Sequence, residues 1–537
     1  MAIKPSEARL WRLLAAGYFP SELPPPFQTE EFAASAADFS KKWDHKKIYE
    51  FWTKPEHYSS PRYGHARRKL SIVNPINQLS VCALLADNWF TVAQRLKRPS
   101  VTEFKPRIVF KGKGRAIPGV DFDEVAKRKV ELLSSYGRYV KTDIARFYSS
   151  IYTHSIAWSI VGKAAAKAQH RKKAFKATFA SMIDAAIRAG QEGQTIGIPI
   201  GPDTSRVISE LIAVEIETDL IRGLTDWQQR SVRYVDDILI GIDDIESEAD
   251  VLSKLTAALY EYELELNAGK TKVNGLGIRH APEWIHYIRS FKLDSRRSRH
   301  RDDLDSYFEH ALFLADENAQ ENVLLFACKR ACSLPLGEEN SGHLVRWLLY
   351  CCRRAPSCLR FVSEFLAAKP PSDLRVRKEV SSFILKQIPR KAEAAHTEEL
   401  AWLLFWAREI GLKLPESALN SCSRVRSSVV ALIALDIRDA GNVEGTLDET
   451  VWRSFCTSDG LGSEMWLVAY EASMRQWWST PENCNFISEH QFFTDVMNKN
   501  VSFYDRKKKA TAHRPALFNL EAQAQVINQS SSNPYDW

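Results

Sequence analysis

Two adjacent carboxylates, Asp236 and Asp237, lie between two apolar, β-branched runs of the chain. Residues 231–235 and 238–242 are predicted to be strands, so the pair is expected at the tip of a β-hairpin. Like charges side by side resist burial unless a cation or full solvation compensates them. Hard carboxylate oxygens suit Mg²⁺, which keeps several waters and also binds substrate phosphates. An acidic turn exposed to water would show the same pattern. The rest of the sequence must therefore distinguish a metal site from such a turn.

A third carboxylate, Asp143, is predicted at the end of a strand over residues 138–143. Phe147 and Tyr148 follow it closely and are expected to flank it. A strand end is a common place to present a metal ligand. The alternative is an acidic residue that stabilises the start of the next helix through the helix dipole.

Residues 60–120 are rich in Lys and Arg, with aromatic residues between them. This mixture suits phosphate contacts and base stacking, and it also fits a solvated surface. Lys111-Gly112-Lys113-Gly114 is predicted to be the tip of a hairpin that approaches a triphosphate, because glycine lets backbone come close to a ligand. A second glycine-rich loop, residues 195–206, leads into a predicted helix over 207–222.

The 537 residues suffice for two to four domains, and the net charge of +7 allows a polyanionic partner without requiring one. No signal-peptide pattern and no membrane-length apolar run occurs, so we expect a cytoplasmic protein with no membrane partner. After residue 296, helix pairs of roughly 35–45 residues predict a HEAT-like repeat array. The predicted parts are an N-terminal helical segment (1–60), an α+β part (61–295), an α-helical repeat domain (296–522) and a flexible tail (523–537).

In order along the chain, these pieces resemble the fingers and palm of reverse transcriptases. Tyr234-Val235-Asp236-Asp237 resembles the catalytic hairpin of that family, and residues 142–148 resemble its first metal-binding segment. Residues 197–206 are similar to the loop beneath template and nucleotide, and 267–271 to the lysine turn near the pyrophosphate.

A closer resemblance is to the bacterial abortive-infection and defence-associated reverse transcriptases. It is carried by Gly17-Tyr18-Phe19-Pro20, by residues 67–71 with Asn74-Pro75, and by residues 147–155 and 198–206. The resemblance covers roughly residues 5–295. Beyond residue 296 it extends only to the presence of a helical extension.

The resemblance implies an RNA-directed DNA polymerase with an α+β right-hand fingers and palm fold. Two Mg²⁺ ions would be held by Asp143 and Asp236, with Asp237 helping and the main-chain carbonyl of Ile144 as a further ligand. Tyr148 would lie under the sugar and favour dNTPs. Lys270 would lie near the departing pyrophosphate, with Lys272 left as an alternative. The other residues implied in nucleotide binding are Lys111, Lys113, Arg115, Gly197, Pro199 and Gly201.

The same resemblance implies an antiphage role, a partner non-coding RNA as template or scaffold, a DNA product, and a homo-oligomer, either trimer or hexamer. Synthesis would be templated or untemplated, and a tyrosine would be the primer if synthesis starts on protein. Tyr18, Tyr504 and Tyr535 are the candidates, in segments expected to be flexible. Two alternatives remain: a retron-type or intron-type reverse transcriptase acting on its own transcript, and a non-catalytic RNA-binding scaffold.

Overall fold

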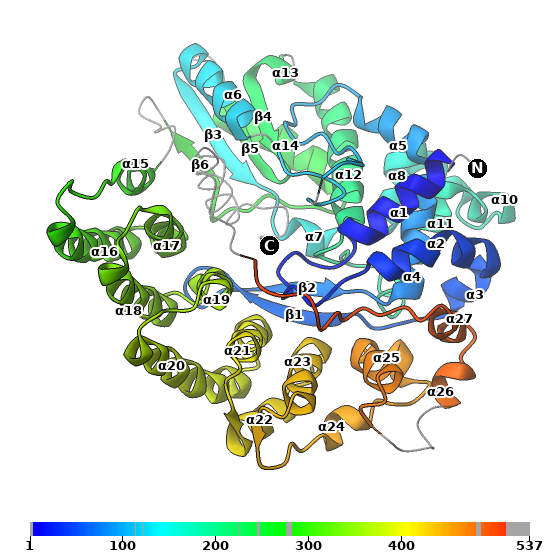
Figure 1. The fold of residues 1–537 in the computed structure, drawn as a ribbon. Coiled ribbons are helices and arrows are strands. Elements are labelled where there is room, and N and C mark those ends of the chain that lie inside the picture. Colours follow the sequence, from blue (N-terminus) through cyan, green and yellow to red (C-terminus); the bar gives the residue numbers. More distant parts are fainter. Residues whose placement is uncertain are drawn as a thin grey trace.

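The computed structural model describes residues 4–112, 114–120, 122–224, 226–243, 247–274, 282–478 and 485–511. Lys113, Tyr535 and the predicted tail over 523–537 therefore lie outside the described residues. Figure 1 shows an α+β part, which contains both larger sheets, and a curved row of helices that follows it in the sequence. None of the described helices has the length and apolar character needed to cross a membrane.

The N-terminal segment folds into α1 (Pro5–Gly17), α2 (Glu30–Lys42) and α3 (His45–Glu50). Residues 30–50 form two helices in place of one continuous helix. Trp43 takes an extended conformation after α2, and the Asp44 side chain then caps α3 by accepting a hydrogen bond from the Lys46 N–H. An Asp at this position stabilises a new helix start, which explains the break.

The first sheet is an antiparallel pair, β1 (Glu56–Pro61) and β2 (Arg67–Ile72). Two helices follow it, α4 (Pro75–Asp87) and α5 (Trp89–Leu96). The expected hairpin around Lys111 has no strand ladder among the described residues. It is a turn closed by a hydrogen bond from the Val109 N–H to the Ala116 carbonyl, and the Arg12 guanidinium donates to the Val109 carbonyl at 2.6 Å.

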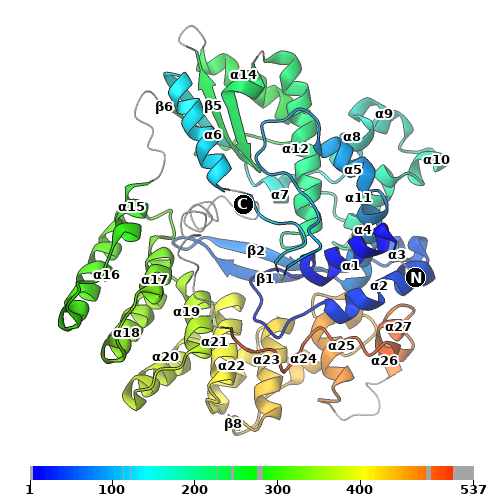
Figure 2. The same ribbon diagram turned by 45° about the horizontal axis from the view of Figure 1, so that its top comes forward.

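The central sheet has the strand order β4-β5-β3-β6. Its strands are β3 (Arg138–Asp143), β4 (Ser231–Tyr234), β5 (Asp237–Ile242) and β6 (Lys272–Asn274), all antiparallel to their neighbours. Val140, Ile240 and Ile242 on one face belong to the main apolar core. Figure 2 shows α12 (Asp203–Gly223) and α14 (Glu248–Tyr260) on one side of the sheet and α6 (Phe122–Ser135) on the other.

Short helices connect these strands. They are α7 (Phe147–Ser150), α8 (His154–Val161), α9 (Lys163–Gln169), α10 (Lys173–Lys176), α11 (Phe179–Ala189) and α13 (Trp227–Arg230). The helix after the glycine loop starts at Asp203, four residues earlier than the sequence predicted, because Asp203 stabilises the start of the helix by its negative charge.

The helices after residue 282 form a curved two-layer row (Figure 1), in which each helix from α15 to α23 contacts the helix two places further along the row. They are α15 (Glu283–Ser290), α16 (His300–Glu317), α17 (Val323–Ser333), α18 (Glu338–Arg354), α19 (Cys358–Ala368), α20 (Leu374–Glu393), α21 (Thr397–Glu409), α22 (Glu416–Ser423), α23 (Ser428–Asp439), α24 (Thr450–Arg453), α25 (Trp466–Met474), α26 (Asn485–Ser488) and α27 (Phe493–Asn498). Two short strands, β7 (Leu414–Pro415) and β8 (Val443–Glu444), and two 3₁₀ turns, η1 (Arg297–Arg299) and η2 (Gly460–Gly462), complete the described elements.

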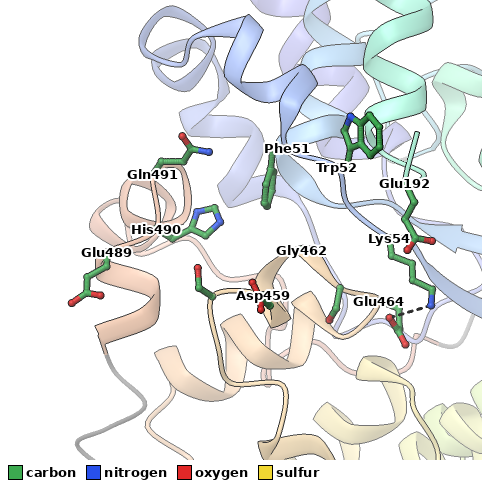
Figure 3. A pocket seen from close by; sticks show the side chains of 12 residues that line it. Phe51, Trp52, Lys54, Glu192, Asp459, Gly462, Glu464, Glu489, His490 and Gln491 are labelled. Atoms are coloured by element: carbon green, nitrogen blue, oxygen red, sulfur yellow. Dashed lines mark ion pairs between the residues drawn. The ribbon is translucent and has the colours of Figure 1, made fainter. Parts of the chain in front are cut away.

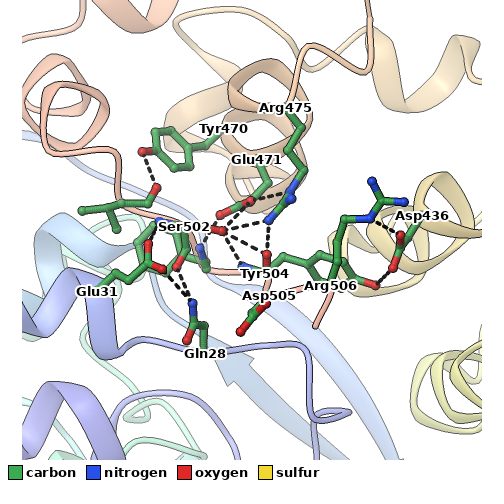
Figure 4. A network of polar contacts seen from close by, with 12 residues as sticks. Gln28, Glu31, Asp436, Tyr470, Glu471, Arg475, Ser502, Tyr504, Asp505 and Arg506 are labelled. Carbon is green, nitrogen blue, oxygen red and sulfur yellow. Dashed lines mark hydrogen bonds and ion pairs between the residues drawn. The ribbon is translucent and has the colours of Figure 1, made fainter. Parts of the chain in front are cut away.

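Residues 499–511 run back from α27 and join the helical row to the N-terminal segment. The Gln28 N–H donates to the Phe503 carbonyl at 2.9 Å, and the Asp505 N–H donates to the Pro26 carbonyl at 2.7 Å. Asp436 on α23 accepts from the Tyr504 hydroxyl and pairs with Arg506 (Figure 4). The two ends of the described chain are therefore held together, and the helical row is fixed to the α+β part.

Candidate active site

Asp143 and Asp237 occupy directly opposed positions on β3 and β5. Opposed residues of an antiparallel pair have Cα atoms about 4.5–5.5 Å apart. Asp236 lies in the tight turn between β4 and β5, and its carbonyl accepts a hydrogen bond of 3.3 Å from the Ile144 N–H. Asp143, which is distant in the sequence from Asp236 and Asp237, is thus their neighbour in space.

The turn that carries Asp236 is held under backbone strain. Val235 has a φ of 55°, in the left-handed region that a β-branched residue rarely adopts. The buried Arg233 donates to the Val235 carbonyl at 2.7 Å and pairs with Glu210 and Glu217 of α12 at 2.7 and 2.6 Å. Those two carboxylates raise the pKa of Arg233 although burial opposes them, so a fixed cation anchors the turn on α12.

The Asp236 carboxylate is fully buried, and neither of its oxygens has a hydrogen-bond partner on another described residue. Burial raises its pKa well above the usual range, and the charges of Asp237 and Asp143 raise it further. A buried carboxylate without a partner is costly, so folds retain one chiefly where a cation binds.

Asp143 is 1% exposed, and burial raises its pKa to about 6 although Lys270 opposes the shift. The Lys270 ammonium lies 2.9 Å from Asp143 Oδ2. The lysine turn is held there by the Asn267 N–H, which donates to the Asp143 carbonyl at 2.9 Å, and by a 2.7 Å hydrogen bond between the hydroxyls of Thr142 and Thr271. The alternative role for Asp143, at a helix start, is not what the structure shows, because Asp143 ends β3.

The donor set fits a divalent cation of the Mg²⁺ type. Asp236 and Asp143 offer hard oxygens, including Asp143 Oδ1, that have no hydrogen bond from the described residues. In the described part of the chain, no group of three or more His, Cys, Asp and Glu side chains is arranged so that it could hold a metal ion by itself. Mg²⁺ does not need one, since it is usually held by one or two carboxylates, waters and substrate phosphates.

The turn after β1 brings a cation to the same place. Burial lowers the pKa of Arg62, and the charges of Asp236 and Asp143 act in the opposite direction, so this guanidinium lies within electrostatic reach of both carboxylates. The sequence marked Arg62 only as one of many basic residues in the region 60–120. The sequence feature that could have singled out Arg62 is its position two residues before Gly64. That glycine forms the turn with a φ of 55°.

Tyr148 is fully buried on α7, and its hydroxyl accepts a 2.9 Å hydrogen bond from Ser209 of α12. The glycine loop lies against it, since the Ile198 N–H donates to the Tyr148 carbonyl at 2.9 Å. Gly197 has a φ of 85°, and a Cβ there would lie 3.2 Å from the Ser149 carbonyl oxygen. Only glycine allows this close approach of the loop to α7.

Gly201 and Pro199 are placed by a second set of contacts. A Cβ on Gly201 would lie 2.8 Å from the Pro20 side chain, and Pro199 is half-buried in the same loop. Arg115, predicted as a triphosphate contact, donates to Asp203 at 3.0 Å and to the Gly201 carbonyl at 2.8 Å. The structure therefore gives Arg115 a role in positioning the glycine loop. Lys111 is exposed.

Tyr18 and Tyr504 do not lie in flexible segments, contrary to expectation. Both are in the core, 1% and 0% exposed, and the Tyr18 hydroxyl donates to the Val73 carbonyl while the Tyr504 hydroxyl donates to Asp436. In this conformation neither phenol is available as a primer, because each is enclosed and hydrogen-bonded. Tyr535 lies outside the described residues.

A cavity of about 650 Å³ lies apart from the carboxylates, where residues 51–54 meet η2 and the turn after α26 (Figure 3). Its lining includes Glu192, Asp459 and Glu489, and Lys54 is paired with Glu464 at 3.6 Å. Carboxylates repel phosphates. This cavity is therefore not a triphosphate site.

Comparison with known proteins relates part of the chain to a known family. Residues 90–287 match the family described as reverse transcriptase (RNA-dependent DNA polymerase). No curated protein sequence matches the chain. Among solved structures, it is similar to telomerase from Candida albicans in complex with a fragment of telomeric RNA, at 12% identity, with 70% of each chain covered and a TM-score of 0.29. It is also similar to apo telomerase from Candida tropicalis, at 11% identity, with 69% of this chain and 74% of that chain covered and a TM-score of 0.29.

TM-scores of 0.29 support no conclusion about the whole chain, so the assignment rests on the family match over residues 90–287. Residues 90–287 contain β3, the glycine loop, the Asp236–Asp237 hairpin and the lysine turn. The chain carries a reverse transcriptase domain, and it is an RNA-directed DNA polymerase, a nucleotidyltransferase.

Proposed function

We propose that Asp143 and Asp236 hold two Mg²⁺ ions for nucleotidyl transfer, with Asp237 and the Ile144 carbonyl beside them. The observation that carries this proposal is the fully buried Asp236 carboxylate, which has no hydrogen bond from another described residue and lies beside two further carboxylates. Ions held by these carboxylates would supply positive charge to the attacking and leaving oxygens of the displacement.

The residues around the carboxylates have separate tasks in this proposal. Arg62, together with Lys111 and Lys113, binds the triphosphate, since Arg62 reaches the carboxylates electrostatically. Lys270 pairs with Asp143 in this structure, and a cation at that carboxylate would free the ammonium to neutralise or protonate the pyrophosphate. Tyr148 fills the space below the sugar and excludes a 2′-hydroxyl by volume, and its contact with Ser209 fixes the ring.

We further propose that the chain is a bacterial defence-associated polymerase that makes cDNA with a non-coding RNA partner. The support is the sequence resemblance over residues 5–295, including 147–155 and 198–206. The two-layer row of helices after residue 282 is compatible with a HEAT-like repeat and with a role in RNA binding or oligomer formation. A trimer or hexamer follows from the resemblance alone.

The defence role is tested by expressing the wild-type chain and an Asp236→Asn variant at equal levels in bacteria that are then challenged with a phage panel. We expect the wild type to lower plaque counts against at least one phage and the variant to give none of this protection. Protection by the variant would show that DNA synthesis is not what protects the cells, and it would contradict the proposal. Sequencing the nucleic acid that co-purifies with each protein identifies the RNA partner, and random cellular RNA in both samples would contradict a dedicated one.

A further inference from the structure

The carboxylates face the same side of the central sheet as two other residues of β3. Side chains alternate along a strand, so Tyr139, Lys141 and Asp143 share one face, while Val140 points into the main core. Asp237 is opposed to Asp143 on β5 and projects on that same face. Lys141 is exposed there.

α6 covers part of this face (Figure 2). Leu132 packs with Tyr139 and Leu239 in a small apolar cluster separate from the main core. The Tyr136 ring lies so close to β5 that a Cβ on Gly241 would be 2.4 Å from it, so only glycine at that position admits the contact. The C-terminal end of α6 is thus fixed on the sheet, and the rest of the helix borders the face that carries the carboxylates.

Lys129 occupies a sheet-facing position of α6. Val125 and Leu132 are 1% and 2% exposed, and Lys129 lies between them at the i+4 and i−3 spacing of one helix face. An apolar residue is expected at such a position. Lys129 is half-buried, whereas Lys127 on the same helix is exposed. A lysine in an otherwise apolar stripe needs a specific reason.

The charges around Lys129 supply a reason for a lysine at this position. Burial lowers the pKa of Lys129, the charge of Lys141 lowers it further, and the charge of Asp237 opposes both. Two ammonium groups therefore stand near each other on the face that carries the carboxylates. The Asp237 carboxylate on this face offsets part of their repulsion, and a phosphate between them would offset it further.

We propose that Lys129 and Lys141 form a binding site for a backbone phosphate of the growing DNA strand. The inference rests on the proposed polymerase function, because it places the strand's reactive end at Asp143 and Asp236. Lys141 precedes Asp143 by two residues, about 7 Å along the strand. That separation places the lysines beyond the transferred phosphate and suits a phosphate of the strand itself.

The test compares Lys129→Met, Lys141→Gln and the double variant with a matched control, Lys127→Met, on the exposed face of α6. Methionine retains the length of Lys129 and suits its apolar surroundings, so the fold is expected to persist, which the thermal unfolding midpoint checks. The probes are a short DNA strand, a short RNA strand, and the DNA annealed to an RNA. Affinity is measured by fluorescence anisotropy over a salt series.

We expect each single variant to weaken binding of the DNA strand several-fold and to reduce the slope of log K against log[salt] by about one, and the double variant to reduce it by about two. Lys129→Arg should restore the wild-type slope, and Lys127→Met should retain it. A double variant with the wild-type slope and affinity would overturn the proposal. A loss confined to the RNA strand would overturn the assignment to the growing strand.

Binding is measured without turnover, so the two proposals fail in different ways. A wild-type chain that incorporates no dNTP, yet shows the lysine-dependent slope, would contradict the proposed function and leave the phosphate site standing. A chain that incorporates dNTPs with unchanged salt slopes in the double variant would contradict the phosphate site alone.

Discussion

The Lys270 ammonium lies 2.9 Å from Asp143 Oδ2, so the lysine turn after α14 and the end of β3 meet in an ion pair. A divalent cation at Asp143 would compete with that ammonium for the same carboxylate. In the proposed function, this competition would release Lys270 from Asp143 toward the leaving group. Lys272 on β6 is opposed to Lys141 instead, which separates the two lysines that the sequence left as alternatives.

Replacing Lys270 by Ala is expected to tighten Mg²⁺ binding and to slow the chemical step. The carboxylate loses its competing ammonium, and the leaving pyrophosphate loses a proton donor, whose contribution is typically about 10²–10⁴-fold. Mg²⁺ titrations followed by thermal shift report the first effect, and single-turnover rates report the second. Lys272→Ala is the matched control, and a rate loss in that variant in place of Lys270→Ala would assign the role to Lys272.

Replacing Tyr148 by Val is expected to raise ribonucleotide incorporation at least about tenfold relative to dNTPs, because a steric exclusion is removed. Competition between dNTP and rNTP in a primer-extension assay measures the ratio. Tyr148→Phe retains the ring volume and removes the hydroxyl that accepts from Ser209, so it should keep the wild-type ratio. Equal discrimination by the Val variant would show that another residue excludes the 2′-hydroxyl.

Phe substitutions at Tyr18 and Tyr504 are expected to leave DNA synthesis unchanged. Each removes one buried hydroxyl that is hydrogen-bonded in the core. Tyr18→Phe should cost about 0.5–1.5 kcal/mol of stability, and Tyr504→Phe about 1.5–3 kcal/mol, because the Tyr504 hydroxyl donates to a carboxylate. Gel mobility of the product before and after proteinase treatment detects DNA that is attached to protein. Loss of attached DNA in either variant, with the fold intact, would mean that the segment opens and that the phenol is the primer.

Glu398 and Glu399 predict opposite effects of pH on the junction between α21 and β1. Burial raises the pKa of Glu398 to about 8, although Arg360 opposes it. Burial also opposes the shift of Glu399, yet His396 and Arg67 hold its pKa at about 2. Glu398 therefore contributes stability below its unfolded pKa of about 4.3 that is lost as pH rises to about 8. Glu399 contributes stability above pH 4.3 that is lost as pH falls toward 2.

Glu398→Gln is accordingly expected to be more stable than the wild type above pH 8, by at most about 5 kcal/mol. Glu399→Gln is expected to be less stable at the same pH. Unfolding midpoints between pH 5 and pH 9 measure both differences, and this range includes the Glu398 pKa of about 8. The loss of the Glu399 contribution falls below about pH 4.3, so the Glu399→Gln difference should stay constant across the range. Parallel pH curves for Glu398→Gln and the wild type would show that Glu398 is ionised throughout this range.

The sequence predicted local features of the site well and long-range contacts poorly. The strand ending at Asp143 and the hairpin at Asp236 follow from short apolar patterns, and both are present. The opposed register of Asp143 and Asp237 joins distant segments, so no local pattern contains it. Lys129 left a signal, a cation in an apolar helix stripe, that becomes meaningful only when the face beneath it is known.

Tyr504 shows why the flexible segments were misjudged. It precedes Asp505 and Arg506 in a strongly charged stretch, a composition typical of solvent-exposed chain. Its partner Asp436 lies on α23, far away in the sequence, and together with Arg506 it pairs the charges that made the stretch look exposed. Local composition cannot reveal a distant partner.

The most direct test of the account measures dNTP incorporation by the purified chain with Mg²⁺ for the wild type, Asp143→Ala and Asp236→Asn. The account predicts a loss of roughly three orders of magnitude or more in each variant, because several kcal/mol of transition-state stabilisation depend on these ligands. Asp236→Asn should be at least as stable as the wild type in chelator, since it removes a buried charge. DNA synthesis at the wild-type rate in either variant would contradict the account.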